Sequence, residues 1–184
     1  MNFSHDVSKT NGNSMMQTLP VQGNTIIDCF KTSGVRSVVA LPDIVTCQNL
    51  LWPIYHDRTM DLIPVCKEDE GVSICAALSY ANHRAVLLIQ HTGFLDSINA
   101  IRAIAVNYQL PVIMFVGVQG MEAHLELHRS ADIGIRSLPK ICEAVELDID
   151  VIQYESDAAR IAKRIDSCYS DSKPHVTFLP QPPA

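Results

Sequence analysis

The chain has 184 residues, of which 47% are hydrophobic and 18% are charged. This length is enough to bury one core but short for two domains. The formal net charge of −6 argues against a nucleic-acid-binding role, because that role requires Lys and Arg clustered on one face. No segment reaches the roughly 20 apolar residues of a membrane span, and the first residues lack the basic and apolar regions of a secretory signal. We therefore expect a cytoplasmic protein without membrane contact, with a flexible tail over residues 1–20 and one domain over residues 21–184.

Apolar residues recur at helical or strand spacing along this domain, and the two kinds of segment alternate. Predicted helices cover residues 25–32 after a cap at Asn24, and residues 45–56, 70–81, 94–107, 138–145 and 156–169. Predicted strands cover residues 35–41, 62–65, 85–89, 111–116, 150–153 and 175–179. This alternation predicts an α/β fold of three layers, with a six-stranded, mainly parallel sheet and helices on both faces.

The carboxyl ends of parallel strands share one edge of the sheet, and ligands of such folds bind beyond that edge. We expect four turns there, at residues 41–43, 65–70, 90–94 and 117–120. The polar segment that follows, up to residue 137, predicts a long surface loop, and loops of this length are usually functional or mobile. Six cysteines lie scattered without a CxxC pair, so we expect reduced thiols, with Cys47 and Cys66 buried near the edge.

The stretch from Cys66 to Asn99 carries the strongest functional signal. Glu70-Gly71 opens a helix with Tyr80 at the tenth place after Glu70, and the next strand ends in the polar turn Gln90-His91-Thr92-Gly93. Carboxylates in a first helical turn are stabilised by free backbone N–H groups, so helix capping is one explanation of the acidic run before Gly71. If one of these acids is functional, the spacing favours Glu70, and a shift of two residues would select Glu68.

This stretch resembles the pyrimidine-binding (alpha) subunit of thiamine-diphosphate-dependent 2-oxo acid decarboxylases, such as sulfopyruvate and phosphonopyruvate decarboxylases. Members of that family usually carry REGEGVGIAAG and QNSGLGNSINAL, where this chain has KEDEGVSICAA and IQHTGFLDSINAI. The VPDS turn of the family corresponds here to Leu41-Pro42-Asp43, with Ile44 in place of the serine. The resemblance covers roughly residues 22–178 and implies the fold of a thiamine-diphosphate pyrimidine-binding domain.

The resemblance also implies roles for single residues. Glu70 would hydrogen-bond the aminopyrimidine ring and so promote the proton transfer that activates the cofactor. Gly71, Gln90, Thr92 and Gly93 would border the cofactor. His91 would contact the substrate or transfer a proton, unless it is a polar turn residue that only hydrogen-bonds backbone. Further predicted substrate contacts are Asp43, Asn99, His128 and Arg129, for which helix capping and surface solvation are the alternatives.

We expect no metal site on this chain. His124 and His128 are four residues apart, which would place both on one face of a helix, but no third or fourth ligand is evident. The chain also lacks the GDG segment, followed by an Asn, that binds diphosphate through Mg²⁺ in this family. The resemblance therefore implies a beta subunit that carries the diphosphate-binding domain and holds most of the Mg²⁺ contacts, in a hetero-oligomer acting on a small 2-oxo acid. The alternatives are a carboligase subunit, or a non-catalytic α/β paralogue that binds a partner.

Overall fold

The computed structural model describes residues 19–122 and 125–184. Six strands form one sheet in the order β2-β1-β3-β4-β6-β5, and every neighbouring pair is parallel. This confirms the predicted three-layer α/β fold. The strands are β1 (Ser37–Ala40), β2 (Asp61–Pro64), β3 (Ala85–Gln90), β4 (Ile113–Gly117), β5 (Asp148–Val151) and β6 (His175–Leu179).

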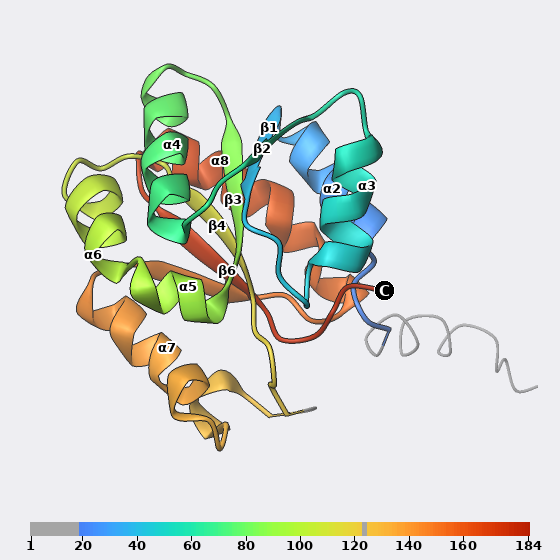
Figure 1. Cartoon of the computed structure of the whole chain (residues 1–184), viewed down its shortest axis with the longest axis vertical. Coiled ribbons are helices and arrows are strands. Elements are labelled where there is room, and N and C mark those ends of the chain that lie inside the picture. The colour runs from blue at the N-terminus through green and yellow to red at the C-terminus, as the bar shows by residue number, and fades with distance from the viewer. Residues whose placement is uncertain (1–18, 123–124) are drawn as a thin grey trace, which may run out of the picture.

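Helical segments connect the strands and cover both faces of the sheet (Figure 1). One face packs against α4, α5, α6 and α7, and the other against α2, α3 and α8. Because β1, β4 and β6 are buried along their whole length and β3 is buried up to Ile89, their apolar residues pack into the cores on both faces of the sheet. The helices are α2 (Gly23–Thr32), α3 (Trp52–His56), α4 (Glu68–Tyr80), α5 (His91–Asp96), α6 (Ile98–Ala100), α7 (Ile133–Ala144) and α8 (Ala159–Asp171). Wider π-helical turns form η1 (Cys47–Leu51) and η2 (Ile101–Val106), and 3₁₀ turns form η3 (Leu127–Arg129) and η4 (Glu155–Asp157).

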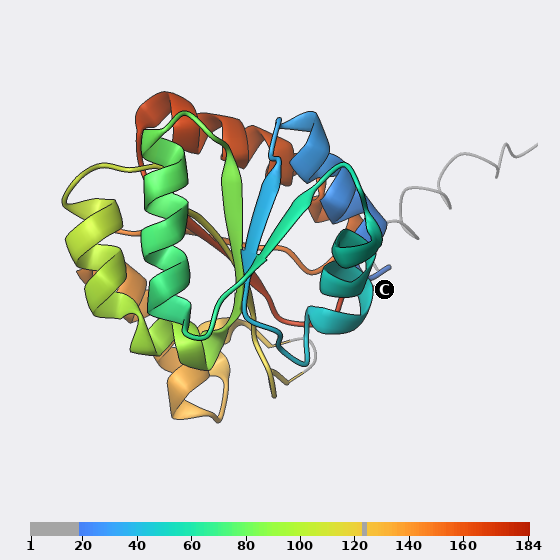
Figure 2. The same cartoon turned by 45° about the horizontal axis from the view of Figure 1, so that its top comes forward.

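The order of the strands reverses between β1 and β3. From β1 the chain crosses to β2 on one side and returns through α4 to β3 on the other side, as Figure 2 shows for the teal β2 and the green α4. A crevice for ligands forms at such a switch point, beyond the carboxyl ends of the two strands. The loop after β1 and the first turns of α4 and α5 meet at this edge, at the lower end of the sheet in Figure 1.

Several predicted element boundaries are wrong, each for a local physical reason. Asn24 does not cap the first helix, which begins at Gly23 because the Ala184 carbonyl accepts the Gly23 N–H at 3.0 Å. The predicted helix over residues 45–56 is a π-helical turn that continues into α3, with Pro53 in the first turn of α3. The strand predicted at residues 150–153 lies two residues earlier, because Asp148 pairs with His175 at the start of β6.

Four helices, α2, α4, α5 and α7, start earlier than the sequence predicts, and the shift is largest for α5 and α7. The predicted polar turn at Gln90–Gly93 is instead the first turn of α5, which begins at His91 directly after β3. Part of the predicted loop up to residue 137 is helix α7, because Asp132 Oδ1 accepts the N–H groups of Gly134 and Ile135 at 2.7 and 3.1 Å. Pro139 lies inside α7.

The first two described residues, Leu19 and Pro20, already pair with a later segment of the domain. The Leu19 carbonyl accepts the Glu155 N–H at 2.9 Å, and Pro20 pairs with Tyr154. Of the predicted tail, residues 1–18 lie outside the described residues. Within the described part of the chain, no helix combines the length and the apolar character that a membrane crossing requires.

Candidate active site

The first turn of α4 carries three carboxylates, two of which are engaged within that turn. Glu70 is exposed, and its Oε2 accepts the Cys66 N–H at 3.1 Å. Asp69 Oδ1 accepts the Glu70 N–H at 2.9 Å, and Asp69 Oδ2 lies 3.6 Å from Lys67 Nζ. Asp69 therefore satisfies a free N–H of the first turn, and Glu70 ties the residue before the N-cap to the helix.

The third carboxylate, Glu68, lies against Gly93 in the first turn of α5. A methyl group on Gly93 would stand 1.9 Å from Glu68 Oε1 and 2.1 Å from its Cδ, so only a glycine leaves room for this side chain. Glu68 is half-buried, and within residues 19–122 and 125–184 its carboxylate has no hydrogen-bond or ion-pair partner. Gly93 thus makes the space in which a half-buried carboxylate is held at the switch point with its acceptor sites free.

His91 follows β3 directly and begins α5. Its residue surface is only 6% exposed, and its buried Nδ1 has no partner in the described structure. Burial lowers the pKa of His91 below the usual histidine range, although the Gly117 backbone and the carboxylates of Asp132 and Asp43 favour the charged ring. Near neutral pH the ring is therefore mainly neutral, with one nitrogen that donates and one that accepts a proton.

Asp43 follows β1 and holds the next turn of the chain. Its Oδ1 accepts the N–H groups of Val45 and Thr46 at 2.7 and 3.1 Å, and its Oδ2 accepts the Thr46 hydroxyl. Gly117, at the end of β4, lies directly beside this turn, since a methyl group there would stand 2.7 Å from Asp43 Oδ1. Asp43 therefore holds the turn before η1 rather than capping a helix, and it faces the same glycine as His91.

A chain of polar side chains continues the edge beyond β3. The Gln90 amide donates to Gln119 Oε1, and Gln90 Oε1 accepts the Thr92 hydroxyl at 2.8 Å. Gln90, Thr92 and Gly93, all predicted to border the cofactor, thus lie at the start of α5, and Glu68 lies against Gly93. The sequence indicates no role for Gln119, which lies in one of the predicted edge turns. Only the pairing of β3 with β4 brings it close to Gln90.

Two predicted residues make contacts elsewhere. Gly71 is buried between α4 and the sheet, where a methyl group would stand 2.5 Å from Leu87 Cδ1. Asn99 is exposed on α6 and accepts a hydrogen bond from Arg102 at 2.9 Å. Their described contacts are structural, and their predicted roles toward a cofactor and a substrate stay predictions.

The loop between β4 and α7 carries the remaining predicted residues. His128 and Arg129 are exposed in η3, and both face Glu126 Oε2, at 3.5 and 3.8 Å. His124 lies outside the described residues. The described residues hold no group of three or more side chains that could bind a metal ion. The prediction that Cys66 and Cys47 are buried is wrong, since Cys66 is exposed before α4, and Cys47, at the start of η1, is only half-buried against the core.

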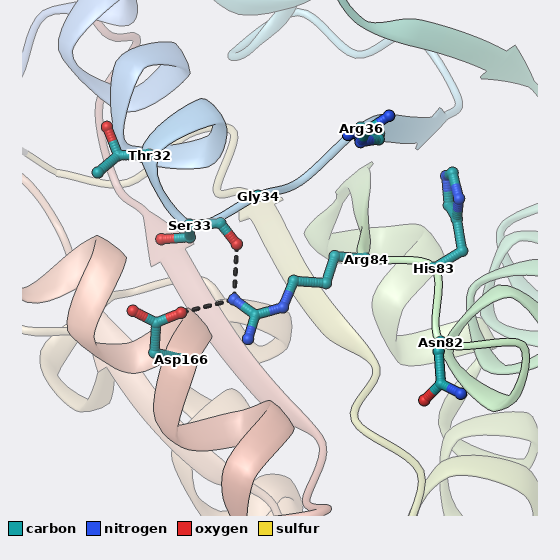
Figure 3. Close-up of a pocket in the computed structure, with 8 residues that line it drawn as sticks. All are labelled: Thr32, Ser33, Gly34, Arg36, Asn82, His83, Arg84 and Asp166. Carbon is teal, nitrogen blue, oxygen red and sulfur yellow. Dashed lines mark hydrogen bonds and ion pairs between the residues drawn. The ribbon is translucent and has the colours of Figure 1, made fainter.

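A hollow of about 700 Å³ lies at the opposite, amino edge of the sheet (Figure 3). Arg84 crosses it, and its Nη1 donates to the Ser33 carbonyl and to Asp166 Oδ1, both at 2.6 Å. Ser33 follows the last residue of α2, and a cation is favourable at a helix C-terminus. These contacts explain Arg84 as part of the fold, and none of the predicted site residues lines this hollow.

Comparison with known proteins gives a consistent set of relatives, although no family model matches the chain. The sulfopyruvate decarboxylase subunit alpha of Methanococcus maripaludis is 31% identical over 135 residues, which are 71% of this chain and 77% of that protein. The subunit alpha of Methanocaldococcus jannaschii is 30% identical over 95 residues, 52% of this chain and 56% of that protein. The sulfopyruvate decarboxylase of Methanosarcina acetivorans is 25% identical over 154 residues, 84% of this chain but only 38% of that longer protein.

The names of these relatives agree with the family that the residues from Cys66 to Asn99 resemble. The Methanococcus maripaludis protein is matched over more than two thirds of both chains. The parallel sheet places that stretch at the switch point, where the Glu68 carboxylate lies against Gly93 of α5 and the buried His91 begins the same helix. The chain therefore belongs to the sulfopyruvate decarboxylase subunit alpha family.

Proposed function

We propose that this chain is the pyrimidine-binding subunit of a thiamine-diphosphate-dependent decarboxylase that acts on a short 2-oxo acid. Family membership supports the decarboxylase part, and the name of the relatives makes sulfopyruvate the first substrate to test. The observation that carries the cofactor part is the Glu68 carboxylate, which lies half-buried over Gly93 with no partner among the described residues.

A carboxylate in this place suits the aminopyrimidine ring of the cofactor. When bound, thiamine diphosphate supplies the electron sink that lets a 2-oxo acid lose carbon dioxide. The part of Glu68 is to accept a hydrogen bond from the protonated ring nitrogen and so to fix the tautomer and the position of the ring. A half-buried acceptor suits this task because the low local dielectric strengthens the bond.

Sequence spacing favours Glu70 for this role, whereas the contacts favour Glu68. Glu70 is exposed and already accepts the Cys66 N–H at 3.1 Å, so a ring nitrogen would have to compete for its oxygen. Glu68 has no such competitor among the residues described. We therefore assign the cofactor contact to Glu68 and keep Glu70 as the alternative that the experiment separates.

His91 is the candidate for proton transfer. The carbon that loses carbon dioxide must gain one proton before the aldehyde product leaves, and a neutral imidazole is suited to pass one on. His91 lies in the same turn of α5 as Gly93, against which the Glu68 carboxylate lies, and its Nδ1 has no partner within the described chain. Thr92 and Gln90 would then border the cofactor, as the sequence predicts.

The diphosphate and Mg²⁺ would be held by a beta subunit with the diphosphate-binding domain. The described residues offer no metal-ligating group of three or more side chains. The match to only 38% of the Methanosarcina acetivorans protein agrees with a chain that forms one part of a larger enzyme. On its own, the chain is therefore expected to bind the cofactor weakly and to release no carbon dioxide.

Co-expression with a beta-subunit candidate that carries GDG and a downstream Asn tests the proposal. Carbon dioxide release from sulfopyruvate and calorimetric binding of thiamine diphosphate with Mg²⁺ are compared for wild type, Glu68→Gln, Glu70→Gln and the matched control Asp69→Asn. We expect Glu68→Gln to lower turnover by roughly 100-fold or more and to weaken cofactor binding, with Glu70→Gln and Asp69→Asn close to wild type.

The other outcomes have defined meanings. Loss of turnover in Glu70→Gln alone would transfer the role to Glu70. Cofactor binding without carbon dioxide release from any 2-oxo acid would point to a carboligase subunit, and a stable complex that binds no cofactor would point to the non-catalytic paralogue.

A further inference from the structure

Three polar side chains form a hydrogen-bonded row at the carboxyl edge of the sheet. Thr92 Oγ1 donates to Gln90 Oε1 at 2.8 Å, and Gln90 Nε2 donates to Gln119 Oε1. Gln90 ends β3, Thr92 belongs to the first turn of α5, and Gln119 lies two residues after β4. The row therefore joins the loop after β4 to the turn that carries His91.

The direction of these hydrogen bonds decides which group of Gln119 is left for a ligand. An amide side chain has one carbonyl oxygen that accepts and one NH₂ group with two donors. Gln119 Oε1 is occupied by Gln90, whereas Gln119 Nε2 has no partner in the described parts of the chain. Turning this amide alone would set its NH₂ group against that of Gln90, so the row opposes the reversal. Gln119 is exposed and thus presents two N–H donors at the end of the row.

The row begins beside the proposed proton-transfer residue. Thr92 directly follows His91 in the first turn of α5. At the centre of the row, Gln90 pairs with Gly117 across β3 and β4, and the Gly117 backbone also acts on the buried ring of His91. Only the side chain of Gln90 therefore separates the turn of His91 from the free donors of Gln119.

Two carboxylates near this edge are engaged with other groups. Asp43 accepts three hydrogen bonds from the turn that follows it. Glu122, three residues after Gln119, accepts the Ser130 hydroxyl at 2.7 Å and the Ala131 N–H at 2.8 Å. The N–H donors of Gln119 therefore remain for a ligand, and an anionic ligand forms the stronger hydrogen bonds with them.

A 2-oxo acid with a second acidic group has two anionic ends, which differ in their fate. The carboxylate leaves as carbon dioxide, so a contact that stabilises it in the bound substrate would oppose the reaction. The group on the third carbon keeps its charge throughout, so a contact to it lowers KM and leaves kcat unchanged. A fixed pair of N–H donors is thus best used on the group that does not react.

We propose that Gln119 is a specificity-determining residue, which binds the anionic group on the third carbon of the substrate through its two N–H donors. Gln90 and Thr92 are the positioning residues that hold its amide in this orientation. The proposal rests on the proposed function and adds to it the residue of this chain that recognises the second anionic group.

The first test compares sulfopyruvate with pyruvate, which lacks the second anionic group, on the complex with the beta subunit. Gln119→Glu keeps an oxygen that accepts from Gln90, but it removes both N–H donors and adds a negative charge. We expect KM for sulfopyruvate to rise about 30-fold with kcat nearly unchanged, and kcat/KM for pyruvate to change less than about twofold. Gln119→Met, which removes the donors without adding a charge, should raise KM for sulfopyruvate roughly tenfold.

Gln109→Glu is the matched control for the added charge. Gln109 is also exposed, but it lines a hollow at the starts of β5 and β6, at the other edge of the sheet. This variant should leave KM for sulfopyruvate unchanged. The proposal would be overturned if Gln119→Glu left KM for sulfopyruvate unchanged, or if Gln109→Glu raised it equally.

A second test needs no turnover, so that failure of the proposed function can be recognised separately. Glutamine NH₂ groups are labelled with ¹⁵N in this chain, alone and with unlabelled beta subunit, and the Gln119 pair is assigned from the Gln119→Glu spectrum. Millimolar 3-sulfopropanoate, which has the sulfonate but no oxo group, is expected to shift the Gln119 pair, while propanoate and the Gln109 pair give no response. Such shifts in a protein that decarboxylates no 2-oxo acid would retain the anion contact and refute the decarboxylase. An unchanged Gln119 pair, or equal shifts with both acids, would refute the contact.

Discussion

At the scale of single residues, the least compensated polar group in the described chain is the side chain of His175 at the start of β6. It is 1% exposed, and neither ring nitrogen has a hydrogen-bond partner, although Nε2 lies 3.6 Å from Asp150 Oδ2. Asp150 Oδ2 instead accepts from Arg164 Nε at 2.8 Å. Burial and the nearby Arg164 charge lower the pKa of His175 to about 4, against the opposing effect of Asp150 and Asp148.

This histidine makes the stability depend on pH in a defined direction. Between its ordinary pKa of 6.5 and the folded value of about 4, the unfolded chain binds a proton that the folded chain does not, so the free energy of unfolding falls as the pH falls. Replacing His175 with Leu should remove this loss, so that the variant gains about 2 kcal/mol relative to wild type between pH 7 and pH 5. Urea unfolding at both pH values measures it, with the exposed His56→Gln as control. Parallel changes in wild type and His175→Leu would contradict the assignment.

At the scale of elements, the contact that organises the site is the one between the first turns of α4 and α5. Glu68 lies on Gly93, and Lys67 Nζ spans from Asp69 to Asp96 at 3.6 and 3.3 Å. Because His91 and Gly93 belong to the same turn of α5, these contacts also hold His91 in position at the edge of the sheet. The first turns of the two helices therefore form one packed unit, and a substitution in the first turn of α4 should alter the packing of α5.

A double-mutant cycle tests this unit. Gly93→Ala should lower the free energy of unfolding by about 1–3 kcal/mol, since its methyl group would overlap the Glu68 side chain. Combining it with Glu68→Gly should recover at least half of that loss, because the overlapping atoms are gone. Chemical unfolding of both single variants and the double variant gives the coupling energy. Additive losses in the double variant would show that the two side chains do not compete for this space.

The sequence predicts those elements whose signal is local. The strand at residues 175–179 and the strand that begins at Ala85 appear at the predicted positions, because continuous apolar runs identify buried parallel strands. The start of α5 at His91 is missed because its polar residues resemble a turn. The start of α7 is missed because the segment up to residue 137 is polar and resembles a loop, so that the cap at Asp132 is not recognised.

The contacts within the candidate site are beyond sequence reasoning for a different reason. Asp43, His91 and Gly117 stand on three separate strand ends, and only the sheet order β1-β3-β4 brings them together. The choice between Glu68 and Glu70 likewise depends on which of the two faces α5. Three consecutive acidic residues in one turn do not indicate which of them does so.

At the scale of the whole molecule, one sheet serves both cores, so the domain should unfold as a single unit. Each apolar cluster takes side chains from the same strands, with Leu87 and Ile89 on one side and Val86 and Leu88 on the other. The described chain has one tryptophan, Trp52 on α3, which reports on one face, while circular dichroism reports on all helices. We expect the urea midpoints from Trp52 fluorescence and from circular dichroism to coincide. Separate midpoints would mean that the α3 side melts independently.

The two ends of the strand order also decide how another polypeptide can attach. β2 forms one edge with Asp61 and with Pro64, which has no N–H group to offer, and β5 forms the other with Asp148 and Asp150. Charges and proline on edge strands discourage the addition of a further strand from another chain. A partner is thus directed away from β-augmentation and toward helices or loops, so recruiting it does not require an open, aggregation-prone sheet margin.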